Sequence, residues 1–260
     1  MHGAKVNFYN ACAFTAQLDH FMRRDMTSLA FAWPTHQNIF SYGVGTDLKR
    51  AYRAAEALTS VVSLLAEKSK ARRIHLLAWS AGGRVVNRAL HDLWAQDPTL
   101  SSQEFKSRYR LGMVYFAASD VPREEFLPAL PALNAMARRI VVTATTKDQA
   151  LDMSRLFIRG GTRIGQLSTD IKAEQLQTVL NAERLEVVNL SQGSEARGFD
   201  IIGHRYWFNH PWASSDVILA IRSDLSAVER GLKETNIDVL WYIPEDYPLR
   251  LRKLALRPNL

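Results

Sequence analysis

Short apolar runs alternate along this chain with longer stretches in which apolar residues recur every three or four positions. The short runs predict β-strands, and the periodic stretches predict amphipathic helices. Such an alternation is typical of βαβ units around a parallel sheet that is buried on both faces. The chain is therefore predicted to be an α/β protein with a mostly parallel sheet and helices on both faces. The predicted strands are Ser28–Trp33, Arg73–Trp79, Leu111–Ala117, Arg139–Thr145 and Leu185–Leu190.

The predicted helices fill the intervals between these strands. A crossover helix follows Thr46-Asp47, which we interpret as its N-cap, because apolar residues from Leu48 to Leu65 keep the helical spacing. The segment Trp241–Pro248 has neither pattern and is interpreted as a packing tail. Further helices are predicted near Ala81–Trp94, Arg123–Ala137, Gln149–Phe157 and Thr169–Ala182.

Length and composition restrict the class of protein. A chain of 260 residues with 47% hydrophobic content is expected to form one domain, residues 1–260. Its apolar runs are too short for a membrane span of about 20 residues. The segment Met1–Phe21 is interrupted by polar residues and does not match a secretory signal. The single cysteine, Cys12, excludes an internal disulfide and is consistent with a reducing compartment such as the cytoplasm.

The net charge of +7 raises the question of a nucleic-acid partner. The basic residues, however, form scattered pairs such as Arg23-Arg24, Arg72-Arg73 and Arg138-Arg139, without a basic stripe that carries interleaved aromatic residues. We therefore expect a cationic, solvated surface and no nucleic-acid partner.

The segment with the clearest chemical signal runs from Ile74 to Val86, where an apolar strand enters a turn of small residues and then an amphipathic helix. This pattern predicts a nucleophile elbow with Ser80 at its tip. The G-x-S-x-G motif requires small residues two positions either side of the serine, because the turn is sharp and strained. Ala78 and Gly82 meet that requirement. The N-terminus of the following helix favours an oxyanion, and the backbone N–H of Ala81 is the expected first donor.

The acid of a catalytic triad in such a fold follows a later strand. Asp148 follows the strand Arg139–Thr145 after a short turn, at the edge of the sheet where α/β sites assemble. The alternative acid is Asp120, which follows the strand Leu111–Ala117. Asp148 is preferred because the acid usually lies one strand later than Asp120.

The base is expected in a loop near the C-terminus. His204 lies in such a loop, beside Gly203, and His210 is its competitor. The other histidines lie before Ser80 or within predicted elements: His2, His20, His36, His75 and His91.

Taken together, these motifs resemble a bacterial α/β-hydrolase family of unknown function, lipase-like or esterase-like in its motifs. The resemblance spans nearly the whole chain and implies the α/β-hydrolase fold, the triad Ser80, Asp148 and His204, and a second oxyanion donor in the turn at Gly3. The corresponding segments are His2-Gly3, Phe31-Ala32-Trp33-Pro34, Ala78–Gly82, Thr145–Leu151 and Gly203-His204-Arg205-Tyr206.

The resemblance also implies that something is missing. In the family the H-G turn follows earlier strands, whereas here it occupies residues 2 and 3. We therefore expect an N-terminally incomplete domain whose first strands are absent, with unpaired edges next to Ser28–Trp33 and Arg73–Trp79. The chain also departs from the family at Trp79, where histidine is commonest, and at Gly83-Arg84.

The sequence thus predicts a serine hydrolase that acts on a small carboxylic ester or acyl substrate through an acyl-enzyme on Ser80. No cofactor or metal is expected, because the chain has no H-E-x-x-H, no paired Cys/His spacing and no P-loop or dinucleotide fingerprint. Two alternatives stay open: a hydrolase-fold protein that binds without turnover, and an amidase or peptidase with the same triad.

Overall fold

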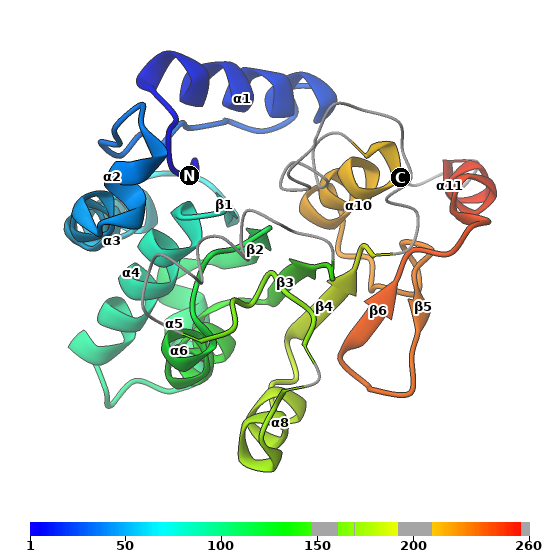
Figure 1. Cartoon of the computed structure of the whole chain (residues 1–260). Coiled ribbons are helices and arrows are strands. Elements are labelled where there is room, and N and C mark those ends of the chain that lie inside the picture. The colour runs from blue at the N-terminus through cyan, green and yellow to red at the C-terminus, as the bar shows by residue number, and fades with distance from the viewer. Residues whose placement is uncertain (147–160, 169, 192–209, 256–260) are drawn as a thin grey trace.

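The computed structural model describes residues 1–146, 161–168, 170–191 and 210–255, without the side chains of residues 39 and 40. Its centre is a six-stranded sheet in the order β1-β2-β3-β4-β6-β5 (Figure 1). The first five strands of this order pair in parallel, and β5 pairs antiparallel with β6. The strands are β1 (Ile74–Trp79), β2 (Leu111–Ala117), β3 (Arg139–Ala144), β4 (Leu185–Asn189), β5 (Lys233–Glu234) and β6 (Leu240–Tyr242).

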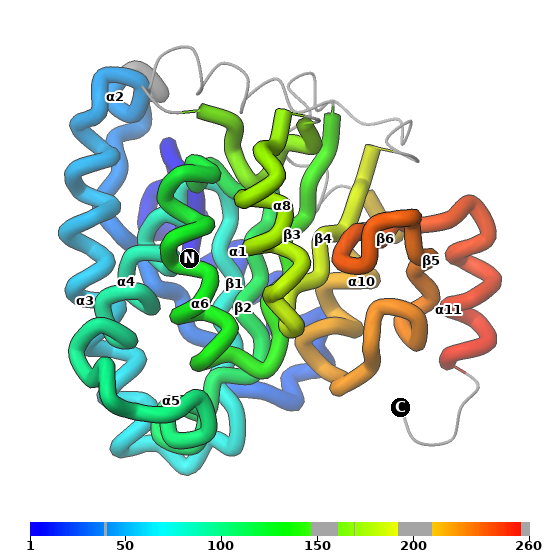
Figure 2. Tube along the Cα trace, turned by 90° about the horizontal axis from the view of Figure 1, so that it is seen from below, coloured from blue at the N-terminus to red at the C-terminus, as the bar shows by residue number. Residues whose placement is uncertain are grey.

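Helices cover both faces of this sheet, as Figure 2 shows from a second direction. One apolar core lies between the sheet and α3, α4, α5 and α6, and a second lies between the other face and α10. The helices are α1 (Phe8–Phe21), α2 (Ile39–Gly43), α3 (Thr46–Lys68), α4 (Gly82–Gln96), α5 (Ser102–Tyr109), α6 (Arg123–Met136), α8 (Ala173–Leu180), α10 (Pro211–Arg222) and α11 (Tyr247–Ala255).

The central strands form where the sequence predicts them because they are apolar on both sides. Every residue of β2 is buried, as expected for a parallel strand between two helical layers. The predictions for Arg73–Trp79, Leu111–Ala117, Arg139–Thr145 and Leu185–Leu190 are confirmed to within a residue or two at their ends. The helices predicted near Arg123–Ala137, Ala81–Trp94 and Thr169–Ala182 are also present, the last one shortened. The helix predicted at Gln149–Phe157 lies outside the described residues.

Three predictions about local structure are wrong. Ser28–Trp33 does not form a strand, because no neighbouring strand pairs with it in the described part of the chain. Trp241–Pro248 is not a packing tail: it contributes to β6, which pairs with β4, and to α11. The N-cap of α3 is Gly45, whose positive φ of 83° suits glycine, while Asp47 turns inward and accepts from the backbone N–H of His36 at 3.0 Å.

The N-terminal residues lie beside the sheet near β1. The terminal amine of Met1 donates to the Leu77 carbonyl at 2.7 Å, and the Trp79 N–H donates to the Met1 carbonyl at 3.1 Å. This is the bonding pattern of a parallel strand pair opposite Ala78. The N-terminal turn is therefore held directly at the carboxyl end of β1, where Ser80 follows.

Candidate active site

Ser80 lies in the turn between β1 and α4 with a backbone φ of 53°. This left-handed conformation is uncommon for a residue with a side chain, and strain of this kind is concentrated at functional turns. The turn is fixed on the sheet side, because the Ser80 N–H donates to the Ala117 carbonyl at 2.9 Å and the Ser80 carbonyl accepts from the Asp120 N–H at 3.2 Å. Ser80 thus lies at a sharp strand-to-helix turn with a left-handed backbone conformation.

The turn needs small residues for reasons that the packing makes visible. A Cβ atom at Gly82 would lie 2.6 Å from the carbonyl oxygen of His2, so a larger residue there would displace the N-terminal segment. Ala78 is fully buried in the core, where its methyl group is accommodated. Alanine in place of the first glycine of the motif is therefore compatible with the turn.

Gly3 lies directly against the serine. A Cβ atom at Gly3 would lie 2.9 Å from the Cβ and 3.4 Å from the Oγ of Ser80. Only a residue without a side chain lets the backbone approach the serine this closely. The structure therefore brings together Ser80, Gly3 and, as the next residue in the chain, Ala81, which immediately precedes α4.

His2 holds the turn at Gly3 through both of its ring nitrogens. Its Nε2 accepts from the Trp33 N–H at 3.1 Å, so in the neutral ring Nδ1 carries the proton, which it donates to the Gly3 carbonyl at 2.8 Å. The His2 ring also stacks on the Trp33 ring at a centroid distance of 5.5 Å. Burial lowers the pKa of His2, which favours this neutral form.

Asp120, the alternative acid, is buried in a network of charged groups behind the turn. Its Oδ1 accepts from Arg163 Nε at 3.0 Å, and its Oδ2 accepts from Arg84 Nε at 3.1 Å and from the Tyr42 hydroxyl. Burial, followed by the Asp120 charge, raises the pKa of Tyr42, so that this hydroxyl stays a donor. Among the described residues, both carboxylate oxygens of Asp120 thus accept from strong donors, two arginines and a tyrosine.

Sequence reasoning did not single out Arg163 or Tyr42, and it noted Arg84 only as a departure from the family. In the structure Arg84 is buried in α4, together with Gly83 and Val85. A buried arginine requires an acidic partner, but the sequence does not say which one.

The ends of β2 and β3 are tied together next to this network. In the segment 161–168, Gly165 donates to the Ser119 carbonyl at 3.1 Å and accepts from the Thr145 N–H at 3.1 Å. Thr146, which follows Thr145, donates to Ser191 Oγ at 2.9 Å. The described chain before Asp148 therefore ends at the carboxyl edge of the sheet, the edge at which Ser80 also lies.

Asp148 and His204 themselves lie outside the described residues. The competitor His210 is described and forms the N-cap of α10, where its Nδ1 accepts from the Trp212 N–H at 3.2 Å. Trp79 packs edge-to-face on Phe14 of α1, with ring centroids 5.7 Å apart.

None of the helices in the described ranges has both the length and the apolar character needed to cross a membrane.

Comparison with known proteins gives one family. Residues 1–221 match the model of an alpha/beta hydrolase family of unknown function, DUF900. No curated protein and no solved structure gives a significant match. The family match confirms the fold class predicted from the sequence, and the parallel sheet with helices around it agrees with that class. The chain belongs to this family of α/β-hydrolases.

Proposed function

We propose that this hydrolase cleaves small carboxylic esters, with Ser80 as nucleophile, His204 as general base and Asp148 as the acid that orients the histidine. Membership of an α/β-hydrolase family indicates a hydrolase. The ester substrate and the triad are the parts that this proposal adds.

In the proposed reaction, Ser80 Oγ attacks the ester carbonyl carbon while His204 accepts its proton. The oxyanion of the tetrahedral intermediate accepts hydrogen bonds from the N–H groups of Ala81 and Gly3. The C–O bond then breaks, and the leaving alcohol takes the proton from the histidine. Water, activated by His204, attacks the acyl-enzyme and releases the carboxylic acid and free Ser80.

The observation that carries the proposal is the backbone of Ser80, which has a positive φ at a strand-to-helix turn and lies against a glycine backbone. The positive end of the α4 dipole supports an anion at this place. The assignment of the acid is supported by the contacts of Asp120, whose carboxylate is held by Arg84 and Arg163. The assignment of the base is supported by the capping role of His210.

A fluorophosphonate probe tests the nucleophile. We expect stoichiometric labelling of the folded protein and loss of labelling in Ser80→Ala, because the reagent reacts with activated serines. Ser119→Ala, which changes a buried serine at the end of the neighbouring strand, is the matched control and should keep the label. If the folded protein takes up no label, the chain binds without turnover. Rates on p-nitrophenyl esters and the matching anilides then separate an esterase from an amidase.

A further inference from the structure

Basic residues gather at the amino-terminal edge of the sheet, at the opposite end of the strands from Ser80. Each of the parallel strands β1, β2, β3 and β4 directly follows a basic residue, and these residues are Arg73, Arg110, Arg138 and Arg184. The amino ends of parallel neighbours lie at the same edge of a sheet. Basic residues that are scattered along the sequence therefore meet in the fold, among them the pairs Arg72-Arg73 and Arg138-Arg139.

These basic residues line a pocket of about 620 Å³, which is within the usual size range of small-molecule sites. Gly112 and Met113 of β2 and Arg139 of β3 line it from the sheet, and both strands are interior strands with a neighbour on each side. The pocket is therefore built between interior strands and two helices. The side chains that α5 and the carboxyl end of α10 contribute to the lining are Gln103, Lys106, Ser107, Ala220 and Ser223.

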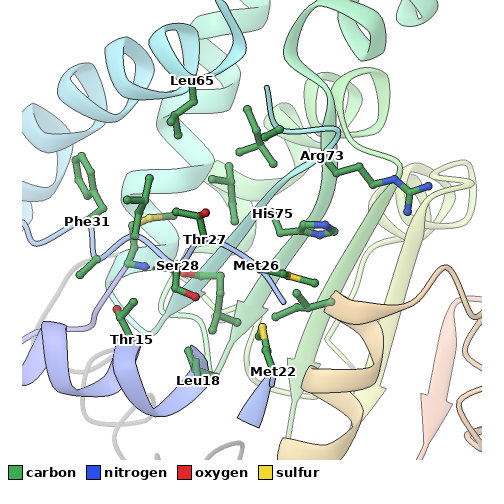
Figure 3. Close-up of a pocket in the computed structure, with 18 of the residues that line it drawn as sticks. Thr15, Leu18, Met22, Met26, Thr27, Ser28, Phe31, Leu65, Arg73 and His75 are labelled. Atoms are coloured by element: carbon green, nitrogen blue, oxygen red, sulfur yellow. Dashed lines mark hydrogen bonds between the residues drawn. The ribbon is translucent and has the colours of Figure 1, made fainter. Parts of the chain in front are cut away.

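His75 of β1 adds a hydrogen-bond donor to this lining. A Cβ atom at Gly112 would lie 2.6 Å from the Cε1 of His75, so the glycine makes room for the ring. Nδ1 of His75 accepts from the Met113 N–H at 3.2 Å, which leaves the proton of the neutral ring on Nε2. Burial, followed by the Arg73 charge, lowers the pKa of His75 and favours this neutral form. Figure 3 shows the side chains of Arg73 and His75 extending to the same side, away from Leu65.

Positive charge outweighs negative charge in the pocket. Of the described residues that line it, seven are basic and one, Asp224, is acidic. Asp224 pairs with Arg73, and its backbone carbonyl accepts from Arg139 at 2.9 Å. Arg110 donates to the Ala66 carbonyl at 2.7 Å, near the carboxyl end of α3, where a cation offsets the helix dipole. Three of the seven cations thus have a partner in the fold.

The other four cations are Arg72, Lys106, Arg138 and Arg184. Within the described ranges none of them forms an ion pair or a side-chain hydrogen bond, so helix carbonyls do not account for them. Burial, followed by the charge of Arg184, lowers the pKa of Lys106, and the nearby Glu183 offsets only part of this effect. These cations are thus close enough to repel one another, and a bound anion would offset the repulsion.

We propose that the pocket binds a small molecule that carries a diphosphate group, whose oxygens accept hydrogen bonds from Lys106, Arg138 and Arg184. Arginine and lysine are the usual partners of phosphate, and the arginine fork binds two of its oxygens at once. The Arg184 carbonyl accepts from the Ile140 N–H at 2.8 Å, so Arg184 is held about 4.8 Å, one strand spacing, from the start of β3. Because Arg138 directly precedes β3, the two arginines suit two linked phosphate groups better than a single one.

Isothermal titration calorimetry of the whole chain with inorganic pyrophosphate and with ADP tests this site. We expect saturable binding at physiological salt that is tighter for both ligands than for orthophosphate or sulfate. The double variant Arg138→Gln/Arg184→Gln, which changes two exposed residues, should weaken binding roughly tenfold or more, because charge-assisted hydrogen bonds are lost. The matched control Arg23→Gln/Arg24→Gln removes the same charge from an exposed pair that does not line the pocket, and it should bind as before.

Acetylation of lysines, followed by mass spectrometry, locates the ligand. Bound pyrophosphate should slow the acetylation of Lys106 and leave that of the exposed Lys49 unchanged. If ADP binds more tightly than pyrophosphate, the ligand is an organic diphosphate, and the reverse order indicates an inorganic one. Ser80→Ala should bind pyrophosphate as the unaltered chain does, so the result is independent of the esterase proposal.

Three results would overturn the proposed site. The first is that neither pyrophosphate nor ADP binds, or that both double variants lose affinity equally. The second is that Lys106 is acetylated at the same rate with and without pyrophosphate. The third is that a single-stranded oligonucleotide binds more tightly than ADP and protects Lys106, because the ligand is then a long polyanion rather than a small molecule.

Discussion

At the scale of single residues, the geometry of the candidate site depends on two glycine positions that have no room for a Cβ atom. A Cβ atom at Gly3 would collide with the side chain of Ser80, and one at Gly82 with the carbonyl oxygen of His2. The sequence motif predicted small residues around Ser80, and the contacts explain why Gly82 is one of them. His2 was noted only as part of a family turn, and the structure gives it a specific structural role, since it links Gly3 to Trp33.

The two ring nitrogens of His2 predict a pH dependence of stability. Burial lowers the pKa of His2 and of His75 below the ordinary value of 6.5. As the pH falls, these two histidines therefore become protonated in the unfolded chain before they do in the folded one. The contribution of the two neutral rings to the free energy of unfolding is complete above about pH 6.5 and decreases as the pH falls below that value. Denaturant unfolding between pH 8 and 5.5 measures this. We expect His2→Gln to flatten the slope of the free energy of unfolding against pH. His20→Gln, which changes an exposed histidine, should leave this slope unchanged. An unaltered slope in His2→Gln contradicts the prediction.

At the scale of elements, the carboxylate of Asp120 joins parts of the chain that meet only in the fold. Tyr42 belongs to α2, Arg84 to α4 and Arg163 to the segment that bridges the ends of β2 and β3. The backbone N–H of Asp120 also bonds to Ser80. Asp120 therefore supports the turn that carries Ser80.

This role separates the effects of two substitutions. Asp120→Asn removes the carboxylate that Arg84 and Arg163 share, although Arg84 keeps its pair with Glu125. We expect the free energy of unfolding to fall by about 3–5 kcal/mol. At a temperature where the variant is still folded, it should keep ester turnover. Asp148→Asn should instead lower kcat for the ester roughly a thousandfold or more. Asp92→Asn, at an exposed helical ion pair with Arg88, is the control and should cost at most about 1 kcal/mol. If folded Asp120→Asn loses ester turnover while Asp148→Asn keeps it, the assignment of the triad acid is reversed.

At the scale of the whole molecule, the residues after the family match are tied to the sheet by a second buried ion cluster. Arg230 is fully buried and donates to Asp216 of α10 at 2.7 Å and to Glu186 of β4 at 2.8 Å. The family match ends at residue 221, so this arginine connects the following segment to the hydrolase core. Beyond it, β6 extends the sheet by pairing with β4.

Removal of this arginine should loosen that connection. In Arg230→Met the buried carboxylate of Asp216 loses its cation, so we expect a loss of about 3–5 kcal/mol in the free energy of unfolding. Arg250→Met breaks a partly exposed i,i+4 pair with Asp246 and should cost less than about 1 kcal/mol. Thermal and denaturant unfolding of the two variants measure the difference. Equal losses in both would show that the cluster does not anchor this region.

The sequence by itself determined the strands from β1 to β4, the crossover helices and the sharp turn at Ser80. These features are local: a buried parallel strand is apolar throughout, a helix repeats its apolar positions, and a sharp turn needs small residues. Asp148 and His204 follow from the chain order of the motif and stay predictions, because they lie outside the described residues.

Only the tertiary structure decided which groups meet. A strand needs a partner, so Ser28–Trp33 is extended without being a strand, and Leu240–Tyr242 becomes one because β4 lies beside it. The carboxylate of Asp120 is paired in the fold with Arg84 and Arg163, which reach it from 36 and 43 residues away. Pairing between distant residues has no local signature, and for that reason the network behind Ser80 is visible only in three dimensions.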